Sequence, residues 1–211
     1  MKLFDNQGKK QSMSTSPTID YRFSSPICRG FLPDLVAKKA ELIQEFESLR
    51  NISKGIKRSN QGGWQSENFI TMARNELLEW TLQEIAQGAL EMVKALSGGQ
   101  GNVTLNFNTM WANINHSGDW NSAHDHNTTW SGIFFLDGQF SEVDSSSQHL
   151  EQGDVVFYNP LSGIRLRGFP NAYTHHPKQG EILLFPGYLL HMVIPHRWDQ
   201  PRVTIAFDAN Q

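Results

Sequence analysis

Two stretches in the first half of the chain carry apolar residues at helical spacing. In the first, from residue 33 to about 51, they recur three, four and seven residues apart: Leu35, Val36, Leu42, Ile43, Phe46 and Leu49. The second begins near Asn68 or Asn75 and ends at Leu96, before a run of glycines. Such spacing places apolar side chains on one helical face, so the pattern predicts two amphipathic helices.

The periodicity changes to two after residue 101. Val103, Leu105 and Phe107 alternate with polar residues, as in a half-buried strand. Further strand candidates are residues 111–115, 130–136, 154–158, 181–185, 189–194 and 202–207. Turn-forming residues separate these runs, and many short strands at such intervals are typical of a sandwich or barrel. We therefore expect a double-sheet β domain over residues 101–211.

The chain before this β domain divides into two segments. Residues 1–18 are polar and rich in serine, glutamine and lysine, and we expect them to be flexible. Residues 19–100 hold the two helices, which we expect to pack on the β domain. The predicted fold class is therefore mainly β with N-terminal helices (α+β).

Composition and charge narrow the function classes. Cys28 is the sole cysteine, which excludes an internal disulfide and a thiolate metal cluster. The net charge is −3 without a long basic run, which argues against nucleic acid as a partner. The small basic group at residues 54–58 fits a solvated helix end. Because no apolar run could span a bilayer and residues 1–5 lack a signal-peptide pattern, we expect a cytoplasmic location without membrane association.

Three histidines are the candidate metal ligands. His124 and His126 are two residues apart at or near a strand end, so in an extended segment both side chains point to one face. His191 sits in an otherwise apolar strand, where a lone histidine also fits a hydrogen-bonded core position. Taken together, the pair and the distant third imidazole can cover one face of a metal ion.

The second metal ligand has two candidates. Non-haem Fe(II) sites usually combine two histidines with one carboxylate on one face of the metal. The nearby carboxylate is Asp125, which points away from that face if residues 124–126 are extended and toward it if they bend. The pattern favours His126 as the second ligand and keeps Asp125 as the alternative.

Arg202 is the candidate anion-binding residue. It shares one face of the last strand with Thr204, while Val203 and Ile205 occupy the other face. A buried arginine requires an anion, because an unpaired buried charge is costly. That anion is either an internal carboxylate, such as Asp208 or Glu181, or a ligand carboxylate held by the two-pronged guanidinium with the Thr204 hydroxyl as a second donor.

These residues resemble those of the Fe(II)/2-oxoglutarate-dependent oxygenases. More narrowly, the chain is similar to a family of 2-oxoglutarate–Fe(II) oxygenases of bacteria and of phages of marine bacteria. The resemblance covers about residues 20–208 and rests on Ser59-Asn-Gln-Gly-Gly-Trp-Gln-Ser66, Trp111-Ala-Asn-Ile114, Asn121-Ser-Ala-His-Asp-His126, Trp130-Ser-Gly-Ile133, Leu184-Phe-Pro186, His191-Met-Val-Ile-Pro195 and Arg202-Val-Thr-Ile-Ala-Phe207. The broad superfamily has His-x-Asp where this chain has His-x-His, a variant common in the narrow family.

The resemblance implies a double-stranded β-helix, a cupin-like jelly roll, with Fe(II) at one mouth and two long helices beside it. It implies that His124 and His191 bind iron, and that Arg202 and Thr204 bind the distal carboxylate of 2-oxoglutarate. It further implies a dioxygenase, acting as a hydroxylase, that uses O₂ and couples decarboxylation of 2-oxoglutarate to succinate with oxidation of a C–H bond. The substrate would be a small molecule or peptide, in the host cytoplasm if a phage encodes the chain.

Further residues have two interpretations each. Asn113 and Asn121 lie near the metal-binding segment and could contact the cosubstrate, although Asn121 equally fits a turn cap. Trp64 and Gln65 could line the mouth as substrate contacts, although Trp64 also fits a residue that pins its loop to the core. His175 and His176 fall in a predicted long loop, where exposure is favoured over a second metal site.

Two other function classes compete with an oxygenase. One is a non-redox, cupin-like metal-binding protein of the sugar-binding or isomerase type, which would suit three histidines. The other is a protein that keeps the fold without turnover. Arg202 discriminates against the first, because a carboxylate clamp near the third ligand has no evident use there. The two predicted helices could also form the contact surface of a homodimer.

Overall fold

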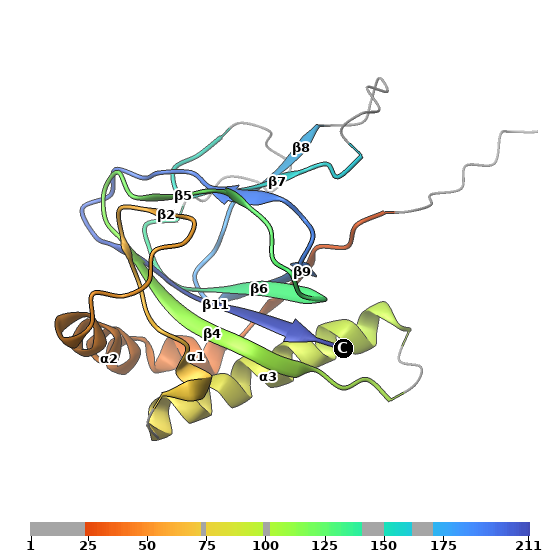
Figure 1. The fold of residues 1–211 in the computed structure, drawn as a ribbon, viewed down its shortest axis with the longest axis horizontal. Helices are drawn as coiled ribbons and strands as arrows, with labels where there is room; N and C mark the ends of the chain where they lie inside the picture. Colours follow the sequence, from red (N-terminus) through yellow and green to blue (C-terminus); the bar gives the residue numbers. More distant parts are fainter. Residues whose placement is uncertain (1–23, 73–74, 99–101, 141–149, 162–170) are drawn as a thin grey trace, which may run out of the picture.

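The computed structural model describes residues 24–72, 75–98, 102–140, 150–161 and 171–211. The segment 1–18, which we expect to be flexible, lies outside the described residues. The described chain forms two antiparallel β-sheets and three α-helices (Figure 1), so the mainly β class with N-terminal helices is confirmed.

The larger sheet has six strands in the order β1-β9-β6-β11-β4-β3. These strands are β1 (Cys28–Phe31), β9 (Glu181–Pro186), β6 (Trp130–Asp137), β11 (Arg202–Asn210), β4 (Asn106–Asn115) and β3 (Trp64–Gln65). All of its strand pairs are antiparallel. The long strands β4, β6 and β11 are adjacent to one another in this sheet.

The smaller sheet has five strands in the order β2-β5-β10-β7-β8, again antiparallel throughout. These strands are β2 (Asn60–Gln61), β5 (Trp120–His124), β10 (His191–Val193), β7 (Val155–Tyr158) and β8 (Ala172–His175). The segment before residue 100 therefore supplies edge strands, β1, β2 and β3, in addition to the helices.

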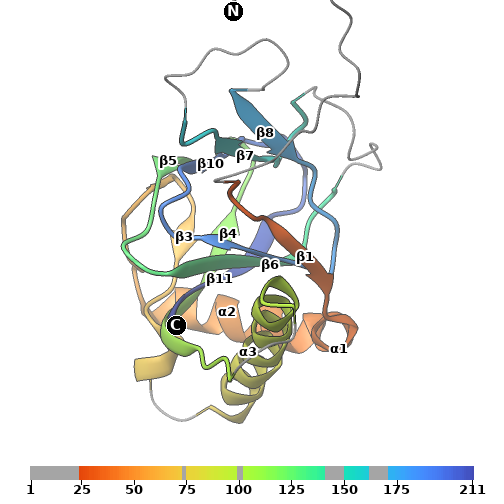
Figure 2. The same ribbon diagram turned by 90° about the vertical axis from the view of Figure 1, so that its right-hand side faces the viewer.

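The helices lie against the outer face of the larger sheet, and the smaller sheet lies on its other side (Figures 1 and 2). They are α1 (Pro33–Ala37), α2 (Lys39–Ile52) and α3 (Glu76–Leu96). Phe46 of α2 and Ile85 of α3 are fully buried in the apolar cluster that joins the helices to the sheet. None of the described helices is both long and apolar enough to cross a membrane.

Alternation along β11 separates two environments. Val203, Ile205 and Phe207 pack in the core between sheet and helices. Arg202 and Thr204 instead line a cavity between residues of both sheets. The period-two pattern thus assigns each face of this strand correctly. A second apolar cluster closes the space between the sheets beside the cavity, and it contains Ile133, Phe135, Val155, Phe157, Leu183, Phe185, Leu189 and Val193.

The predicted helices are present, with one correction. The first is interrupted at Lys38 (φ −96°, ψ 9°), which separates α1 from α2. Of the two predicted starts for the long helix, Asn75 is the one used: its side chain accepts from the N–H groups of Leu77 and Leu78. Asn68 caps a separate 3₁₀ turn, η1 (Phe69–Thr71).

Candidate metal and 2-oxoglutarate site

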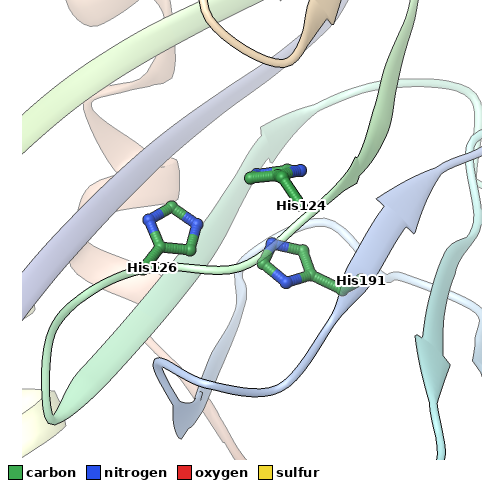
Figure 3. A group of neighbouring side chains, drawn as sticks. All are labelled: His124, His126 and His191. Atoms are coloured by element: carbon green, nitrogen blue, oxygen red, sulfur yellow. The ribbon is translucent and has the colours of Figure 1, made fainter.

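The three candidate histidines converge between the two sheets (Figure 3). His124 ends β5, His191 begins β10, and the two residues are direct partners in the antiparallel pair. His126 follows two residues after the strand end. Each ring offers a nitrogen within 4.8 Å of those of the other two, which is the spacing that ligands of one metal ion require.

Each Nδ1 atom of the three imidazoles has an oxygen partner. The Nδ1 of His124 lies 2.7 Å from the carbonyl oxygen of Ser122, and that of His191 lies 2.9 Å from the carbonyl oxygen of Leu189. The Nδ1 of His126 lies 3.1 and 3.2 Å from the carboxylate oxygens of Asp208. With the proton on Nδ1 donated to these oxygens, the Nε2 lone pairs are left for a metal.

Burial keeps two of the rings neutral. Burial, together with the nearby His124, lowers the pKa of His191 to about 3. Burial also lowers the pKa of His124, against the raising effect of its hydrogen bond to Ser122. Metal ligands must be neutral imidazoles, so both shifts favour metal binding at neutral pH.

Asp125 does not belong to the metal-binding group of the described residues, although it borders the same cavity. It is exposed, whereas the histidines on either side of it are partly buried. This alternation is the one expected of an extended 124–126 segment. The geometry thus supports His126 over Asp125 as the second ligand.

Arg202 is buried in the same cavity without a carboxylate partner among the described residues. The side chain is 2% exposed, and its Nε and Nη2 atoms have no hydrogen-bond partner there. The two candidate internal partners are engaged elsewhere, Asp208 by His126 and Glu181 by His175. The guanidinium lies 5.4 Å from the ring centroid of Phe135, and burial lowers its pKa to about 10.

The free atoms of Arg202 define the ligand it would take. Nε and Nη2 lie on one edge of the planar guanidinium, so together they form the fork that fits a carboxylate. Leaving both buried donors unpaired is costly, and an anionic ligand would relieve this cost. The arrangement therefore fits the distal carboxylate of a bound dicarboxylate.

The neighbouring polar residues lie where the alternation predicts. Thr204 is buried beside Arg202 on β11, and the side-chain amide of Asn113 donates to its hydroxyl at 3.4 Å. Asn121 donates to the hydroxyl of Ser59 at 3.2 Å, and this hydroxyl lies 3.3 Å from Nε2 of His124. Asn121 thus belongs to a hydrogen-bond chain that reaches a metal-facing nitrogen.

The cavity has a volume of about 760 Å³, within the usual range for small-molecule sites. It contains all three histidines, and Arg202, Thr204, Asn113, Asn121 and Gln65 also line it. Trp64 does not line it, which corrects the substrate-contact interpretation of this residue. Its ring is buried in the core, and its Nε1 donates to the carbonyl oxygen of Ser53 at 3.0 Å.

His175 and His176 are not exposed, and this prediction was wrong. Both are almost fully buried at the end of β8. The Nε2 of His175 lies 2.9 Å from a carboxylate oxygen of Glu181, and the Nδ1 of His176 lies 3.0 Å from one of Asp154. Their partners are carboxylates, so among the described residues the metal-binding group remains the three histidines in the cavity.

The contact between Asp208 and His126 was not predicted from the sequence. The signal was present, because Asp208 follows Arg202 and Thr204 at even spacing and so shares their face of β11. The place of Ser59, Lys57 and Arg58 on the cavity wall was not predicted either. Their loop contributes to the cavity through β2, a strand too short to leave a pattern in the sequence.

Comparisons with known proteins agree with this geometry. Residues 109–208 match a family described as "Putative 2OG-Fe(II) oxygenase". A search of curated proteins gave no match. The matched segment holds all three histidines and Arg202, and over it the chain is similar to the 2-oxoglutarate- and Fe(II)-dependent oxygenases.

Solved structures share the fold at low sequence identity. A prolyl-4-hydroxylase of Pseudomonas putida is 13% identical with a TM-score of 0.58, covering 89% of this chain and 94% of that one. HygX of Streptomyces hygroscopicus, solved with nickel, 2-oxoglutarate and hygromycin B, is 13% identical with a TM-score of 0.57, covering 88% and 83%. A Trichoplax adhaerens prolyl hydroxylase, solved with a hypoxia inducible factor peptide, is 13% identical with a TM-score of 0.57, covering 87% and 83%.

Proposed function

We propose that the chain is an Fe(II)- and 2-oxoglutarate-dependent hydroxylase in which His124, His126 and His191 bind the metal and Arg202 binds the cosubstrate. One observation carries this proposal: the buried guanidinium of Arg202 has two unpaired donors among the described residues, in the cavity where the histidines converge. A dicarboxylate of the size of 2-oxoglutarate would offer one end to the metal and the other to Arg202.

We infer that the two sheets form a double-stranded β-helix. Strands β4, β6, β9 and β11 lie together in the larger sheet, and β5, β7, β8 and β10 lie together in the smaller one. Eight antiparallel strands that pass between two facing sheets in this way are the arrangement of a jelly roll. On this interpretation the edge strands β1, β2 and β3 and the helices extend the jelly roll.

The residues around the cavity have distinct roles in this proposal. The carbonyl oxygens of Ser122 and Leu189 hold the rings of His124 and His191 so that both Nε2 atoms face the same point. Asp208 does the same for His126 through its carboxylate. When bound, Fe(II) supplies the oxidation of a substrate C–H bond by O₂, coupled to decarboxylation of 2-oxoglutarate to succinate.

Arg202 and Thr204 orient the cosubstrate from the far side of the cavity. The fork of Arg202 sets the direction of the distal carboxylate, and the Thr204 hydroxyl is a second donor held by Asn113. Phe135 on β6 lies against the guanidinium, and the apolar cluster to which this ring belongs helps to keep water from it. Fixed orientation and a dry environment strengthen the charge-assisted bonds.

The non-redox, cupin-like alternative is less well supported. Three histidines alone would suit it, since such a ligand set binds several metals. It gives no role, however, to a buried arginine whose donors await an anion. The substrate class in the proposal is a small molecule or a peptide, as for the relatives solved with hygromycin B and with a peptide fragment.

The test is decarboxylation of 2-oxoglutarate without a primary substrate. With Fe(II), ascorbate and O₂, we expect slow formation of succinate by the natural protein and none by His191→Ala. Calorimetry should also show that 2-oxoglutarate binds the metal-loaded protein. Succinate no higher than in the His191→Ala control, with no cosubstrate binding, would overturn the proposal. Thermal unfolding of His191→Ala, compared with that of the natural protein, shows whether the variant is folded.

A further inference from the structure

We propose that Lys57 and Arg58 form the recognition site for an anionic group, a carboxylate or a phosphate, on the primary substrate. Both residues line the cavity that holds the three histidines. Helix α2 ends at Ile52, so these residues belong to the loop that follows it and not to the helix end predicted from the sequence. The inference rests on the proposed oxygenase function and names the substrate class of that site.

Hydrogen bonds fix the loop that carries the basic pair. The N–H of Ile56 donates to the carbonyl oxygen of Gln65 at 2.8 Å, and the N–H of Arg58 donates to the side chain of Asn60 at 2.8 Å. The amide of Asn60 in turn donates to the carbonyl oxygen of Ile56 at 3.3 Å. The backbone thus presents the two cations in a defined place at the cavity wall.

Gly55 explains why the loop adopts this path. Its φ of +68° lies in the left-handed region that favours glycine. A Cβ atom there would lie 2.4 Å from the carbonyl oxygen of Gln65 and 2.7 Å from the ring of Trp64. The loop therefore passes close to the buried Trp64 just before the two basic residues that line the cavity.

The two cations have no carboxylate partner within the described chain. None of its ion pairs involves Lys57 or Arg58, and both side chains are exposed. Of the two acidic residues lining the cavity, Asp208 is bound to His126, and Asp125 is exposed at the rim. The basic pair is thus available to a molecule that enters the cavity.

The charge of the loaded site points to an anion. The cavity has three cationic side chains, Lys57, Arg58 and Arg202, and two carboxylates. A divalent metal and doubly charged 2-oxoglutarate cancel each other, so the site keeps a net positive charge when both are bound. The next molecule to enter is the primary substrate, and a positive cleft attracts and orients an anionic one.

The rest of the nearby wall suits a polar substrate. The side-chain amide of Gln65 is partly exposed on the cavity wall, and no described residue hydrogen-bonds to it. The amide of Asn68, by contrast, is engaged by backbone groups of Ile70, Met110 and Asn108. Gln65 thus offers a donor and an acceptor beside the basic pair, for a hydroxyl or amide near the anionic group.

The test measures anion binding to the loaded protein. Protein carrying redox-inert Zn(II) and ¹³C-labelled 2-oxoglutarate is titrated with inorganic phosphate and, separately, with acetate. Calorimetry follows the anion, and NMR confirms that 2-oxoglutarate stays bound. We expect saturable binding of at least one anion, weakened about tenfold or more in the double variant Lys57→Gln, Arg58→Gln, because two charge-assisted contacts are lost. The anion that binds identifies the group as phosphate or carboxylate.

Lys54→Gln is the matched control, since Lys54 is exposed in the same loop but does not line the cavity. It should bind anions as the natural protein does. Binding of neither anion overturns the proposal, as does equal binding by the double variant, or a loss as large in Lys54→Gln. Failure of 2-oxoglutarate to bind the Zn(II) protein in the first place refutes the proposed function instead, and is seen before any anion is added.

Discussion

The carboxylate of Asp208 lies 3.1 Å from Nδ1 of His126, on the side of the ring away from the metal-facing nitrogen. The hydroxyl of Thr109 donates to the same carboxylate at 3.3 Å. Trp111 stacks on the His126 ring with centroids 6.1 Å apart. In the proposed site, the negative charge that a His-x-Asp motif places directly on the metal would instead lie behind the imidazole of His126, on Asp208.

Removing this carboxylate charge should weaken metal binding. In Asp208→Asn the amide oxygen can still accept from Nδ1 of His126, but the negative charge that polarises the ring is lost. Loss of such a partner typically costs about 10–100-fold in metal affinity. Competition with a chelator measures the change. Asp125→Asn is the control, because Asp125 borders the cavity but is exposed and outside the metal-binding group. A larger loss in Asp125→Asn than in Asp208→Asn would make Asp125 the ligand.

Changing His126 to the aspartate of the superfamily's His-x-Asp motif should reverse the effect of Asp208 on metal affinity. In His126→Asp two carboxylates would face each other without a ring between them, and like charges at short range oppose each other. We expect this variant to bind metal more weakly than the natural protein. Adding Asp208→Asn should then strengthen binding, whereas it weakens binding in the natural background. Metal affinities of the natural protein, the two single variants and the double variant form a double-mutant cycle that measures this change of sign. Additive effects would show that the two residues are not coupled.

Arg202 should be required for binding of 2-oxoglutarate. In the protein without this ligand, the same buried charge should lower the free energy of unfolding. Arg202→Met removes a buried cation without a described partner and keeps most of the volume, so the free energy of unfolding should rise by roughly 1–3 kcal/mol. Binding of 2-oxoglutarate, measured by calorimetry, should fall below detection. Arg202→Lys keeps the charge but loses the fork, so its affinity should lie in between. A destabilised Arg202→Met would indicate a structural partner for the guanidinium.

Most of the correct predictions about this site came from the alternation of side chains along strands. The even positions of β11 face the cavity and the odd positions face the helices, as the pattern of residues 202–207 indicates. The same reasoning placed His124 and His126 on one face. These inferences succeed because side-chain direction in a strand depends on local backbone geometry, which a short sequence window contains.

Contacts between distant segments could not be predicted in this way. His175 and His176 look like loop residues because their own neighbours are polar, yet Glu181 and Asp154 bury them by pairing. Such pairing depends on how strands meet within and between the two sheets, and no local pattern records it. The basic loop at Lys57 is a similar case, since its place at the cavity follows from the pairing of β2 with β5.

His196 should make folding stability depend on pH. Burial lowers its pKa, and Arg202 and His116 lower it further, against Asp119 and the hydrogen bond to the carbonyl oxygen of Asn115, which raise it. The neutral ring fits its contacts: Nε2 donates to Asn115 at 3.0 Å, and Nδ1 accepts from the backbone N–H of Trp198 at 3.3 Å. Protonation of Nδ1 would remove this acceptor.

The direction of the pH effect follows from the lowered pKa. As pH falls below about 6.5, the unfolded chain binds a proton at this histidine before the folded protein does, so stability is lost toward acid. His196→Gln keeps a donor and an acceptor but does not titrate. Urea unfolding at pH 7.5 and 5.5 should show a smaller loss of free energy for this variant, by up to about 1.4 kcal/mol. The other histidines contribute equally to both proteins, so identical losses would mean that His196 is protonated in the folded state as readily as in the unfolded chain.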